Sequence, residues 1–363
     1  MKVLIVSDAQ SVHTQRWVSS LSKKGVEIVL YSIVPYDGNF YTSRGIRCHY
    51  FDLFDYKRKN LSPFTPIKRH LQAIKDLKRV IKEEKPQILH SHFVTSYSLI
   101  AALSGFHPLV ESVWGSDVYI YPKKSFLHKW LVKYTLSKAD KVLSTSNVMA
   151  RETAKYTNKE IEITPFGVNT QHFCRTKERP KDKFIIMSVK SISQNYGTEY
   201  LIRAFAEVVK RHPNLDCSLE LIGKGPFLAK MTLLTWSLGI EDKVKFRGYI
   251  SNEKLAQELE NCSIACYMSI SESFGVSAIE AMACECPVVA SNADGFTEVI
   301  EDGVTGIIVP RKDYMAAADA IEKFIINREL VDKMGKAGRE RVCKLYNWDE
   351  NVQQMISIYN KMV

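Results

Sequence analysis

Two glutamates, Glu272 and Glu280, lie eight positions apart in a segment that follows a predicted strand and ends in a helical pattern. The first turn of a helix offers backbone amides without partners and a partial positive charge. A diphosphate could therefore bind to the amides of Phe274, Gly275 and Val276, where the glycine permits close approach. Carboxylates only accept hydrogen bonds, which suits the hydroxyl groups of a sugar. The pattern predicts a diphosphate site flanked by groups that bind sugar hydroxyls.

The same residues also permit a purely structural interpretation. Ser277 and Glu280 have the S-x-x-E spacing of a capping box, in which the two side chains satisfy the first amides of a helix. Glu272 would then be an ordinary loop acid. The residues alone leave both interpretations open.

Glycines mark three further loops in the second half of the chain. Gly223 lies in a turn at 221–226, between a predicted strand and a predicted helix, where doubly wound domains contact phosphate or sugar. A tight turn alone would also require that glycine. Residues 294–296 are predicted to form a turn, and residues 302–306 a short hairpin before a strand at 307–309.

Polar side chains also follow two predicted strands of the first half. Ser11 and His13 lie where the strand at 3–6 passes into a helix, and Asp117 follows the strand at 109–113. Both loops should face one ligand crevice. His13 has the range of protonation that acid–base work needs, and Asp117 could accept a proton from a hydroxyl nucleophile. A lone histidine or aspartate can equally be structural, and the sequence leaves this open.

Metal-binding patterns are missing from the sequence. It contains no D-x-D triplet, the usual arrangement that holds a divalent ion on a diphosphate. The cysteine pairs at 262/266 and 284/286 lack the second half of a zinc site. We therefore expect no metal and no cofactor, and we expect amides and Lys or Arg side chains to meet the phosphate charge.

Short apolar strands and longer helical patterns alternate along the 363 residues. Predicted strands lie at 3–6, 26–31, 88–90, 184–189, 218–222, 244–246 and 264–268, and predicted helices at 14–24, 198–211, 226–238 and 252–261. This alternation predicts parallel sheets covered by helices. A charged segment with a proline at 171–183 marks a linker. We therefore predict an α/β protein of two doubly wound domains, each binding ligands beyond the carboxyl ends of its strands.

The net charge of +10 comes from the first half of the chain. Residues 1–170 contain 25 Lys and Arg against 14 Asp and Glu, whereas residues 171–363 contain 25 against 26. Two segments, the helical pattern after Pro66 and residues 121–141, combine lysines with apolar side chains. Each is either the solvated face of a helix over the core or a surface that docks on an anionic membrane. Nucleic acid is the least favoured of these partners.

The location follows from the apolar runs. No run approaches the ~18 residues that span a bilayer, and the N-terminal run is too short for a secretory signal. We expect a cytoplasmic protein, peripheral on the inner face of the membrane if the basic segments dock there.

Several motifs occur in order along the chain. The E-x7-E of Glu272 and Glu280 is accompanied by LIGKGP at 221–226, FRGYIS at 246–251, EVIEDGVTGIIVP at 298–310 and SVWGSDV at 112–118. With these motifs the chain resembles the retaining GT-B glycosyltransferases of glycosyltransferase family four over nearly its whole length. The resemblance implies two Rossmann-like domains facing a central cleft. An acceptor-binding domain would span 1–170 and a nucleotide-sugar-binding domain 171–348, with a C-terminal helix at 349–363 crossing back to the first domain.

The resemblance also implies roles for single residues. Glu272 would contact the transferred sugar, and Glu280 would bind the nucleotide ribose. The amides at 274–276 would meet the diphosphate, the turn at Gly223 would lie on the donor side, and the backbone of Tyr249 and Ile250 would flank the base. On the acceptor side, Asp117 matches the family motif, and Ser11 and His13 lie in a loop similar to that of family members.

Two loops depart from the family pattern. Family members carry an Arg and a Lys before the glycine of the first strand–helix loop of the second domain, and both grip phosphate. Ser191 and Tyr196 stand at those positions here, so the adjacent Lys190 is our candidate for the catalytic cation. Trp114 stands where many members have a histidine, so no role can be transferred from that histidine.

The implied reaction is metal-independent transfer of a hexosyl group from a nucleoside diphosphate sugar, with UDP as our choice of nucleotide, to a hydroxyl of a glycan or lipid-linked acceptor. The anomeric configuration would be retained. Two other functions stay open at this point. One is a sugar-nucleotide epimerase on a similar fold, and the other is a non-enzymatic basic protein that binds a membrane surface.

Overall fold

The computed structural model describes residues 1–54, 65–180 and 182–363 of the chain. These residues form two compact units, one made of residues 1–165 and 350–363 and the other of residues 166–349. In the described part of the chain, no helix combines the length and the apolar composition that spanning a membrane requires.

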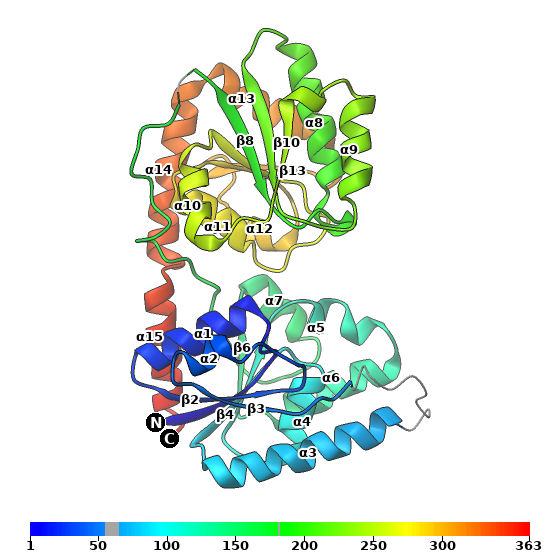
Figure 1. The fold of residues 1–363 in the computed structure, drawn as a ribbon, viewed down its shortest axis with the longest axis vertical. Helices are drawn as coiled ribbons and strands as arrows, with labels where there is room; N and C mark the ends of the chain where they lie inside the picture. Colours follow the sequence, from blue (N-terminus) through cyan, green and yellow to red (C-terminus); the bar gives the residue numbers. More distant parts are fainter. Residues whose placement is uncertain (55–64, 181) are drawn as a thin grey trace. The chain divides into compact units, whose positions relative to one another are not determined.

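The first unit is built on a parallel sheet in the order β3-β2-β1-β4-β5-β6-β7 (Figure 1). Its strands are β1 (Lys2–Val6), β2 (Glu27–Ser32), β3 (Arg47–Tyr50), β4 (Ile88–His92), β5 (Leu109–Val113), β6 (Lys141–Ser144) and β7 (Ile161–Ile163). β1, β4 and β5 are almost entirely buried, as expected for strands that helices cover on both faces. β1 is mostly apolar, whereas β4 and β5 also bury polar side chains.

Helices connect successive strands of the first unit. They are α1 (Val12–Lys23), α2 (Asn39–Thr42), α3 (Thr65–Glu84), α4 (Ser96–Ser104), α5 (Ser116–Tyr119), the 3-10 turn η1 (Tyr121–Lys123), α6 (Phe126–Lys138) and α7 (Asn147–Thr153). The chain returns to this unit in α15 (Trp348–Asn360), whose residues from Glu350 onward belong to it. The Tyr359 hydroxyl lies 2.6 Å from Nδ1 of His90, a buried residue of β4.

The second unit repeats the design with a parallel sheet in the order β10-β9-β8-β11-β12-β13. The strands are β8 (Phe184–Val189), β9 (Cys217–Ile222), β10 (Val244–Gly248), β11 (Ile264–Tyr267), β12 (Val288–Ser291) and β13 (Gly306–Val309). The connecting elements are η2 (Gln194–Tyr196), α8 (Thr198–Arg211), α9 (Leu228–Ser237), η3 (Glu241–Lys243), α10 (Asn252–Glu260), α11 (Val276–Ala283), α12 (Asp294–Val299), α13 (Tyr314–Ile326) and α14 (Arg328–Leu345).

Local sequence explains where these elements form. In α8, Leu201, Ile202, Phe205 and Val208 recur at helical spacing and are all buried, while Lys210 and Arg211 stand in the last turn, where cations favour the helix dipole. The apolar side of α8 joins one core with β8, β9 and α13. The predicted α/β fold of two doubly wound domains is confirmed.

Two local predictions meet different outcomes. At 302–306 a tight turn is closed by an isolated bridge between Asp302 and Gly306, and the amide of Gly303 donates to the carbonyl of Gly306. The strand that follows, β13, pairs in parallel with β12. Residues 294–296 are not a free turn, because they begin helix α12. In both places glycine and aspartate signal a change of chain direction, but the sheet decides which element follows.

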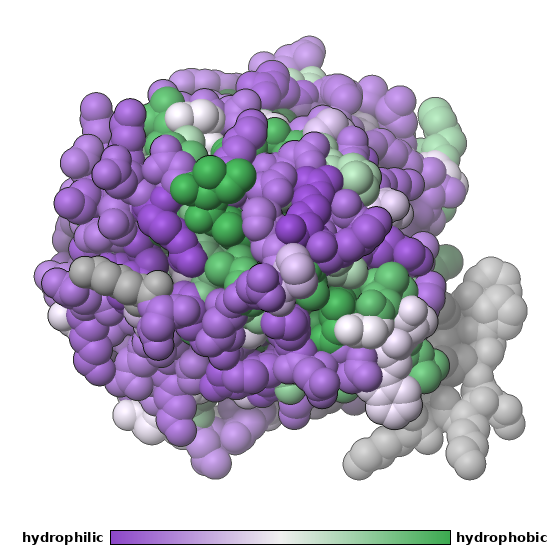
Figure 2. Space-filling view, turned by 90° about the horizontal axis from the view of Figure 1, so that it is seen from above, coloured by the Kyte–Doolittle hydropathy of each residue, from purple (hydrophilic) through white to green (hydrophobic). Residues whose placement is uncertain are grey.

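Hydrophilic side chains cover most of the face drawn in Figure 2, where the hydrophobic groups form separate patches. Several helices expose neighbouring large apolar side chains. On α6 these are Phe126, Leu127 and Trp130, on α9 they are Leu228, Leu233 and Trp236, and on α3 they are Ile67 and Leu71.

Candidate active site

The sheet order of the second unit creates a topological switch between β8 and β11, which are neighbours in space and from which the strand order runs in opposite directions. Doubly wound sheets bind ligands at such a point, beyond the carboxyl ends of the strands. Lys190 follows β8, and Glu272 lies in the loop after β11. The Lys190 ammonium lies 2.6 Å from Oε2 of Glu272, and the two side chains are only 14 % and 11 % exposed. The structure thus brings together two of the three predicted catalytic groups, Lys190 and Glu272, across the switch point.

Aromatic rings surround this ammonium. Nζ of Lys190 lies 5.1 Å from the ring centre of Tyr196, 5.7 Å from Phe296 and 6.0 Å from Tyr267. A cation over the face of an aromatic ring is attracted by the ring quadrupole. Tyr196, one of the two residues of this loop that depart from the family pattern, therefore contacts the lysine. The other departure, Ser191, turns away and donates to the carbonyl of Lys224 at 2.9 Å.

Helix α11 begins beside this pair. Its N-cap, Gly275, has a φ of 105°, which favours glycine. Among the described residues, the amides of Gly275, Val276 and Ser277 have no hydrogen-bond partner. They form the kind of anion site that a helix start provides.

The capping-box interpretation is wrong. Ser277 lies inside α11 rather than at its N-cap, and no side chain caps this helix. The Ser277 hydroxyl is buried without a hydrogen-bond partner in the described chain, so it does not satisfy an amide of the first turn.

Gly295 supports the same loop, and sequence reasoning missed its role. Its amide donates to the carbonyl of Glu272 at 2.9 Å, and a Cβ at this position would collide with the backbone of Phe274. The Phe274 side chain is buried and lies against the rings of Phe166 and Tyr346. The loop with Glu272 is therefore fixed from both sides. The glycine in the segment at 294–296 was the available signal, but only the fold shows what packs on it.

Gly223 shapes the lysine loop. Its φ is 145°, and a Cβ there would collide with the carbonyl of Lys190. The Gly223 amide donates to the carbonyl of Gly248 at 2.7 Å, which ties the turn after β9 to the end of β10. Gly223 thus allows two backbone segments to pack closely. It would influence a bound ligand only indirectly, by setting the position of Lys190.

Replacing Gly223 by alanine should therefore lower stability and displace Lys190. We expect a loss of about 2–4 kcal/mol in the free energy of unfolding, because backbone strain and a steric overlap add. Gly239→Ala is the matched control: Gly239 has a φ of 66°, but an added Cβ meets nothing within 4 Å. Denaturant unfolding of both variants measures the difference. Equal losses of unfolding free energy in the two variants would show that the steric overlap with Lys190 does not contribute to the destabilisation.

The other predicted donor-side residues lie in the same unit. Glu280 is buried in the second turn of α11. Tyr249 and Ile250 directly follow β10, where the Tyr249 side chain is exposed. These placements leave their predicted roles as predictions.

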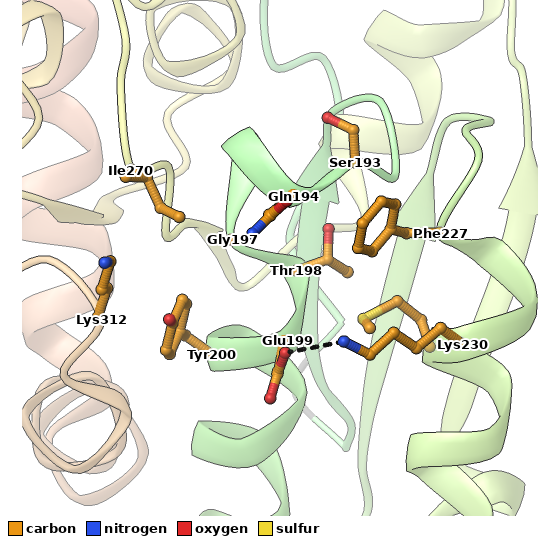
Figure 3. A pocket seen from close by; sticks show the side chains of 11 residues that line it. Ser193, Gln194, Gly197, Thr198, Glu199, Tyr200, Phe227, Lys230, Ile270 and Lys312 are labelled. Carbon is orange, nitrogen blue, oxygen red and sulfur yellow. Dashed lines mark ion pairs between the residues drawn. The ribbon is translucent and has the colours of Figure 1, made fainter.

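A separate pocket of the second unit lies at the starts of α8 and α9. Figure 3 shows Lys312 and Lys230 on opposite sides of it, with Lys230 paired to Glu199 at 3.9 Å. Gln194, Gly197 and Thr198 also line the pocket, whereas Lys190, Glu272 and Glu280 do not. It is therefore distinct from the pair at the switch point.

In the first unit, Asp117 is fully buried, and its carboxylate accepts hydrogen bonds from the amides of Val94 at 2.9 Å, Gly115 at 2.6 Å and Trp114 at 3.2 Å. Burial raises its pKa above the ordinary value, and the amides oppose that rise. These bonds give Asp117 a part in positioning the loop at 114–117, and its catalytic role stays a prediction.

His13 lies in a buried environment that shifts its protonation. Burial, with a smaller contribution from Arg16, lowers the pKa of His13 to about 4. The imidazole is therefore neutral at pH 7 and is not poised to titrate there. The ring of Trp114 lies 6.0 Å from His13 and 4.4 Å from His92, so the residue that departs from the family pattern packs between two histidines. Ser11 is the N-cap residue of α1, and its side chain makes no capping bond.

Two family models match the chain. Residues 171–341 match the model of the glycosyl transferases group 1, and residues 2–146 match the model described as glycosyl transferase 4-like. Among curated proteins, N-acetyl-alpha-D-glucosaminyl L-malate synthase of Bacillus anthracis is 26% identical over 77% of this chain and 76% of its own length. An uncharacterised glycosyltransferase of Methanocaldococcus jannaschii is 23% identical over 97% of this chain and 94% of its own length.

Solved structures share the fold. Anabaena HepE in complex with UDP has a TM-score of 0.81 at 17% identity, covering 99% of this chain and 100% of HepE. Sucrose-phosphate synthase from Thermosynechococcus elongatus has a TM-score of 0.78 at 20% identity, covering 99% of this chain and 98% of that one.

Proposed function

We propose that this chain, a glycosyltransferase that belongs to the group 1 family, transfers a hexosyl group from a nucleoside diphosphate sugar to a hydroxyl of a lipid-linked or glycan acceptor, with retention of configuration. The observation that carries the proposal is the pair of Lys190 and Glu272 beside the free amides of α11, at the switch point of the second unit.

The proposed reaction exchanges one bond for another. The bond between the anomeric carbon and the diphosphate oxygen breaks, and the acceptor oxygen bonds to that carbon. The departing diphosphate takes both electrons of the broken bond and receives the proton of the acceptor hydroxyl. Negative charge grows on the diphosphate and positive character grows on the sugar, so preorganised charges of the opposite sign lower the barrier.

The residues divide between these two charges. Lys190 has three N–H donors, of which Glu272 accepts one, so others can bind phosphate. The amides of Gly275 and Val276 would bind the same phosphates, and we propose that together with Lys190 they meet the charge without a metal or other cofactor. Glu272 would orient the sugar hydroxyls.

Glu280 and the strand end after β10 complete the proposed donor site. Glu280 would accept hydrogen bonds from the ribose, and the backbone of Tyr249 and Ile250 would flank the base. On the acceptor side, Ser11 and His13 stay a prediction, with His13 as a neutral hydrogen-bond partner.

The first test is a thermal-shift panel with UDP, GDP, ADP and TDP, with and without EDTA. A ligand that binds only the folded state raises the melting temperature. UDP is our first choice because HepE, which shares the fold, was solved with UDP. A shift with one nucleotide that survives EDTA supports the proposal and names the sugar donors to assay. No shift with any of the four at millimolar concentration would count against a working donor site.

Glu280→Ala is expected to weaken nucleotide binding about tenfold or more, because a buried carboxylate that accepts hydrogen bonds contributes about 1.5–3 kcal/mol. Titration calorimetry measures the affinity. Glu329→Ala, at an exposed glutamate in the first turn of α14, is the control and should bind as the parent does. Unchanged affinity in the Glu280 variant would remove Glu280 from the site.

The two alternative functions are not favoured, because both matched families are glycosyl transferases. Incubating the donor with and without an acceptor separates them. Transfer yields a glycosylated acceptor and free nucleoside diphosphate. An epimerase would convert the donor without acceptor, and a binding protein would leave the donor intact. The anomeric configuration of the product, read by nuclear magnetic resonance, tests retention.

We propose that the reaction takes place in the cytoplasm. All eight cysteines are free thiols, and five of them are buried. Free thiols fit a reducing compartment.

A further inference from the structure

Helix α6 exposes apolar side chains on the side that points away from the core. Phe126, Leu127 and Trp130 are 85 %, 60 % and 50 % exposed, and Ile120, just before the helix, is also exposed. On the opposite side of α6, Val132 and Leu136 are buried in the core. The helix is thus apolar on both sides, unlike a surface helix of a soluble protein, whose outer side is normally charged. We call Ile120, Phe126, Leu127 and Trp130 the α6 wedge.

Lysines surround the wedge. Between Asp117 and Asp140 the chain has five lysines and no acidic residue. Lys124 lies over the Tyr121 ring at 5.6 Å and Lys138 over the Tyr134 ring at 5.4 Å. No ion pair among the described residues holds Lys129 or Lys133. Their charges are therefore open to an external anion.

A basic hollow continues this surface. Lys133 and Ser137 of α6 line it together with Lys155 and Lys159, which follow α7. Lys159 is fixed by donating to the carbonyls of Ser137 and Ala139, and Lys155 pairs with Glu152 at 2.5 Å. Of the three lysines that line the hollow, Lys133 alone makes neither a hydrogen bond nor an ion pair with the described chain. The hollow can receive a phosphate group beside the wedge.

The aromatic groups have the arrangement that suits a membrane interface. The rings of Trp130 and Tyr134 stack with centres 5.4 Å apart and planes at 16°. Trp and Tyr are enriched at the level of lipid headgroups, and basic side chains beside an apolar helix face favour anionic lipid. A protein partner of this surface would need a complementary acidic and apolar patch. A bilayer that contains anionic lipid supplies both components by its composition.

The second basic segment differs over part of its length. Ile67 and Leu71, in the first half of α3, are each 62 % exposed. From Ala73 onward, α3 buries Ala73, Leu77 and Val80 and directs Lys75, Lys78 and Lys82 into solvent. That second part of α3 is an ordinary amphipathic surface helix, so the solvated-face interpretation holds for it.

We infer that the α6 wedge and its lysines form a docking surface for an anionic lipid bilayer. The apolar side chains insert at the headgroup level, and Lys124, Lys129 and Lys133 contact lipid phosphates. This function goes beyond the proposed transfer reaction and does not depend on it. It would bring the enzyme to the surface where a lipid-linked acceptor resides.

Co-sedimentation of the full chain with vesicles tests the inference. One set of vesicles is phosphatidylcholine alone, and the other contains equal parts of phosphatidylcholine and phosphatidylglycerol. We expect binding to the second set, weakened by salt. The double variant Phe126→Ser/Trp130→Ser should bind at least about tenfold more weakly. Lys129→Gln/Lys133→Gln should bind about 25-fold more weakly, because each lysine near anionic lipid contributes about fivefold.

Trp236→Ser is the matched control, because Trp236 on α9 of the second unit is 64 % exposed and should leave vesicle binding unchanged. All variants should keep the thermal shift with UDP, which shows that fold and donor site are intact and separates this test from that of the proposed function. Three results would overturn the inference: no binding to either vesicle set, equal binding to both, or an equal loss in the Trp236 variant. Duplex DNA binding as tightly as the vesicles, and failing with the same variants, would assign the surface to nucleic acid instead.

Discussion

Replacing Lys190 by methionine is expected to lower kcat for sugar transfer about 10²–10³-fold, the effect of removing one preorganised charge from a site where charge develops. Methionine keeps the length and much of the packing against Tyr196, Tyr267 and Phe296 but cannot bind phosphate. Initial rates with the donor found by the thermal-shift panel measure the effect. Lys190→Arg should recover part of the activity, because it restores the charge.

A matched lysine in the same unit controls for charge alone. Lys230 is 65 % exposed, pairs weakly with Glu199 at 3.9 Å and lies in the separate pocket. Lys230→Met removes the same charge and should leave kcat within about twofold of the parent, because exposed ion pairs contribute little. A similar loss in both variants would mean that the total charge of the unit matters rather than the position of Lys190.

Stability has to be separated from catalysis in this experiment. Removing one partner of a mostly buried ion pair leaves the other charge uncompensated and is strongly destabilising. The double variant Lys190→Met/Glu272→Gln has neither charge, so it should regain most of the stability that Lys190→Met loses. Its turnover should stay low. If turnover returned together with stability, the pair would be structural and the donor-site proposal would fail at its central observation.

The sequence predicts much of the fold because the signals for its elements are local. β8 and α8 lie at the predicted residues 184–189 and 198–211, since a buried apolar run and an amphipathic repeat are properties of neighbouring positions. The loop of Glu272 could be located for the same reason, because a strand, a glycine and a helix follow one another there. The motif spacing then indicates which chemistry the loop serves.

The sequence is least informative where distant residues decide the environment of a side chain. Asp117 has the sequence context of a site residue, and the structure adds that it accepts a hydrogen bond from the amide of Val94, which lies in another loop. The pKa of His13 depends on burial, which no local pattern reveals. Tyr196 looks like the loss of a cation until the fold brings its ring to Lys190. In each case the missing information is a tertiary contact rather than a propensity.

Glu111 is a further residue that the sequence did not single out. It lies in the centre of β5, is fully buried, and accepts a hydrogen bond from the Ser91 hydroxyl at 2.5 Å through Oε2. Its Oε1 has no hydrogen-bond partner in the described chain. Burial raises the pKa of Glu111 to about 8, with an added contribution from Asp117. The folded protein therefore holds this carboxyl protonated at pH 7.

This pKa gives stability a definite dependence on pH. The unfolded chain releases the proton near the ordinary value of 4.5, whereas the folded chain keeps it until about pH 8. Within that window the folded state binds more protons, so stability falls as pH rises, by up to about 1.4 kcal/mol per pH unit. The buried His90, whose pKa is lowered to about 3, acts in the opposite direction below its ordinary value of 6.5. The contribution of His90 is the same in the parent and in a variant of Glu111, so it cancels when their free energies of unfolding are subtracted.

Glu111→Gln should remove the loss of stability that the parent shows as pH rises, because glutamine has nearly the same shape as glutamate and never ionises. We expect the free energy of unfolding of the variant, relative to the parent, to rise by about 3–4 kcal/mol between pH 5 and pH 8. Urea unfolding at several pH values measures this difference, and Glu160→Gln, at an exposed position of the same unit, should show no such trend. A constant difference across the window would mean that Glu111 is ionised in the folded state. A charge at the centre of β5 would then need water or a cation beside Oε1. In that case the end of the sheet below the loop at 114–117 would be hydrated rather than dry.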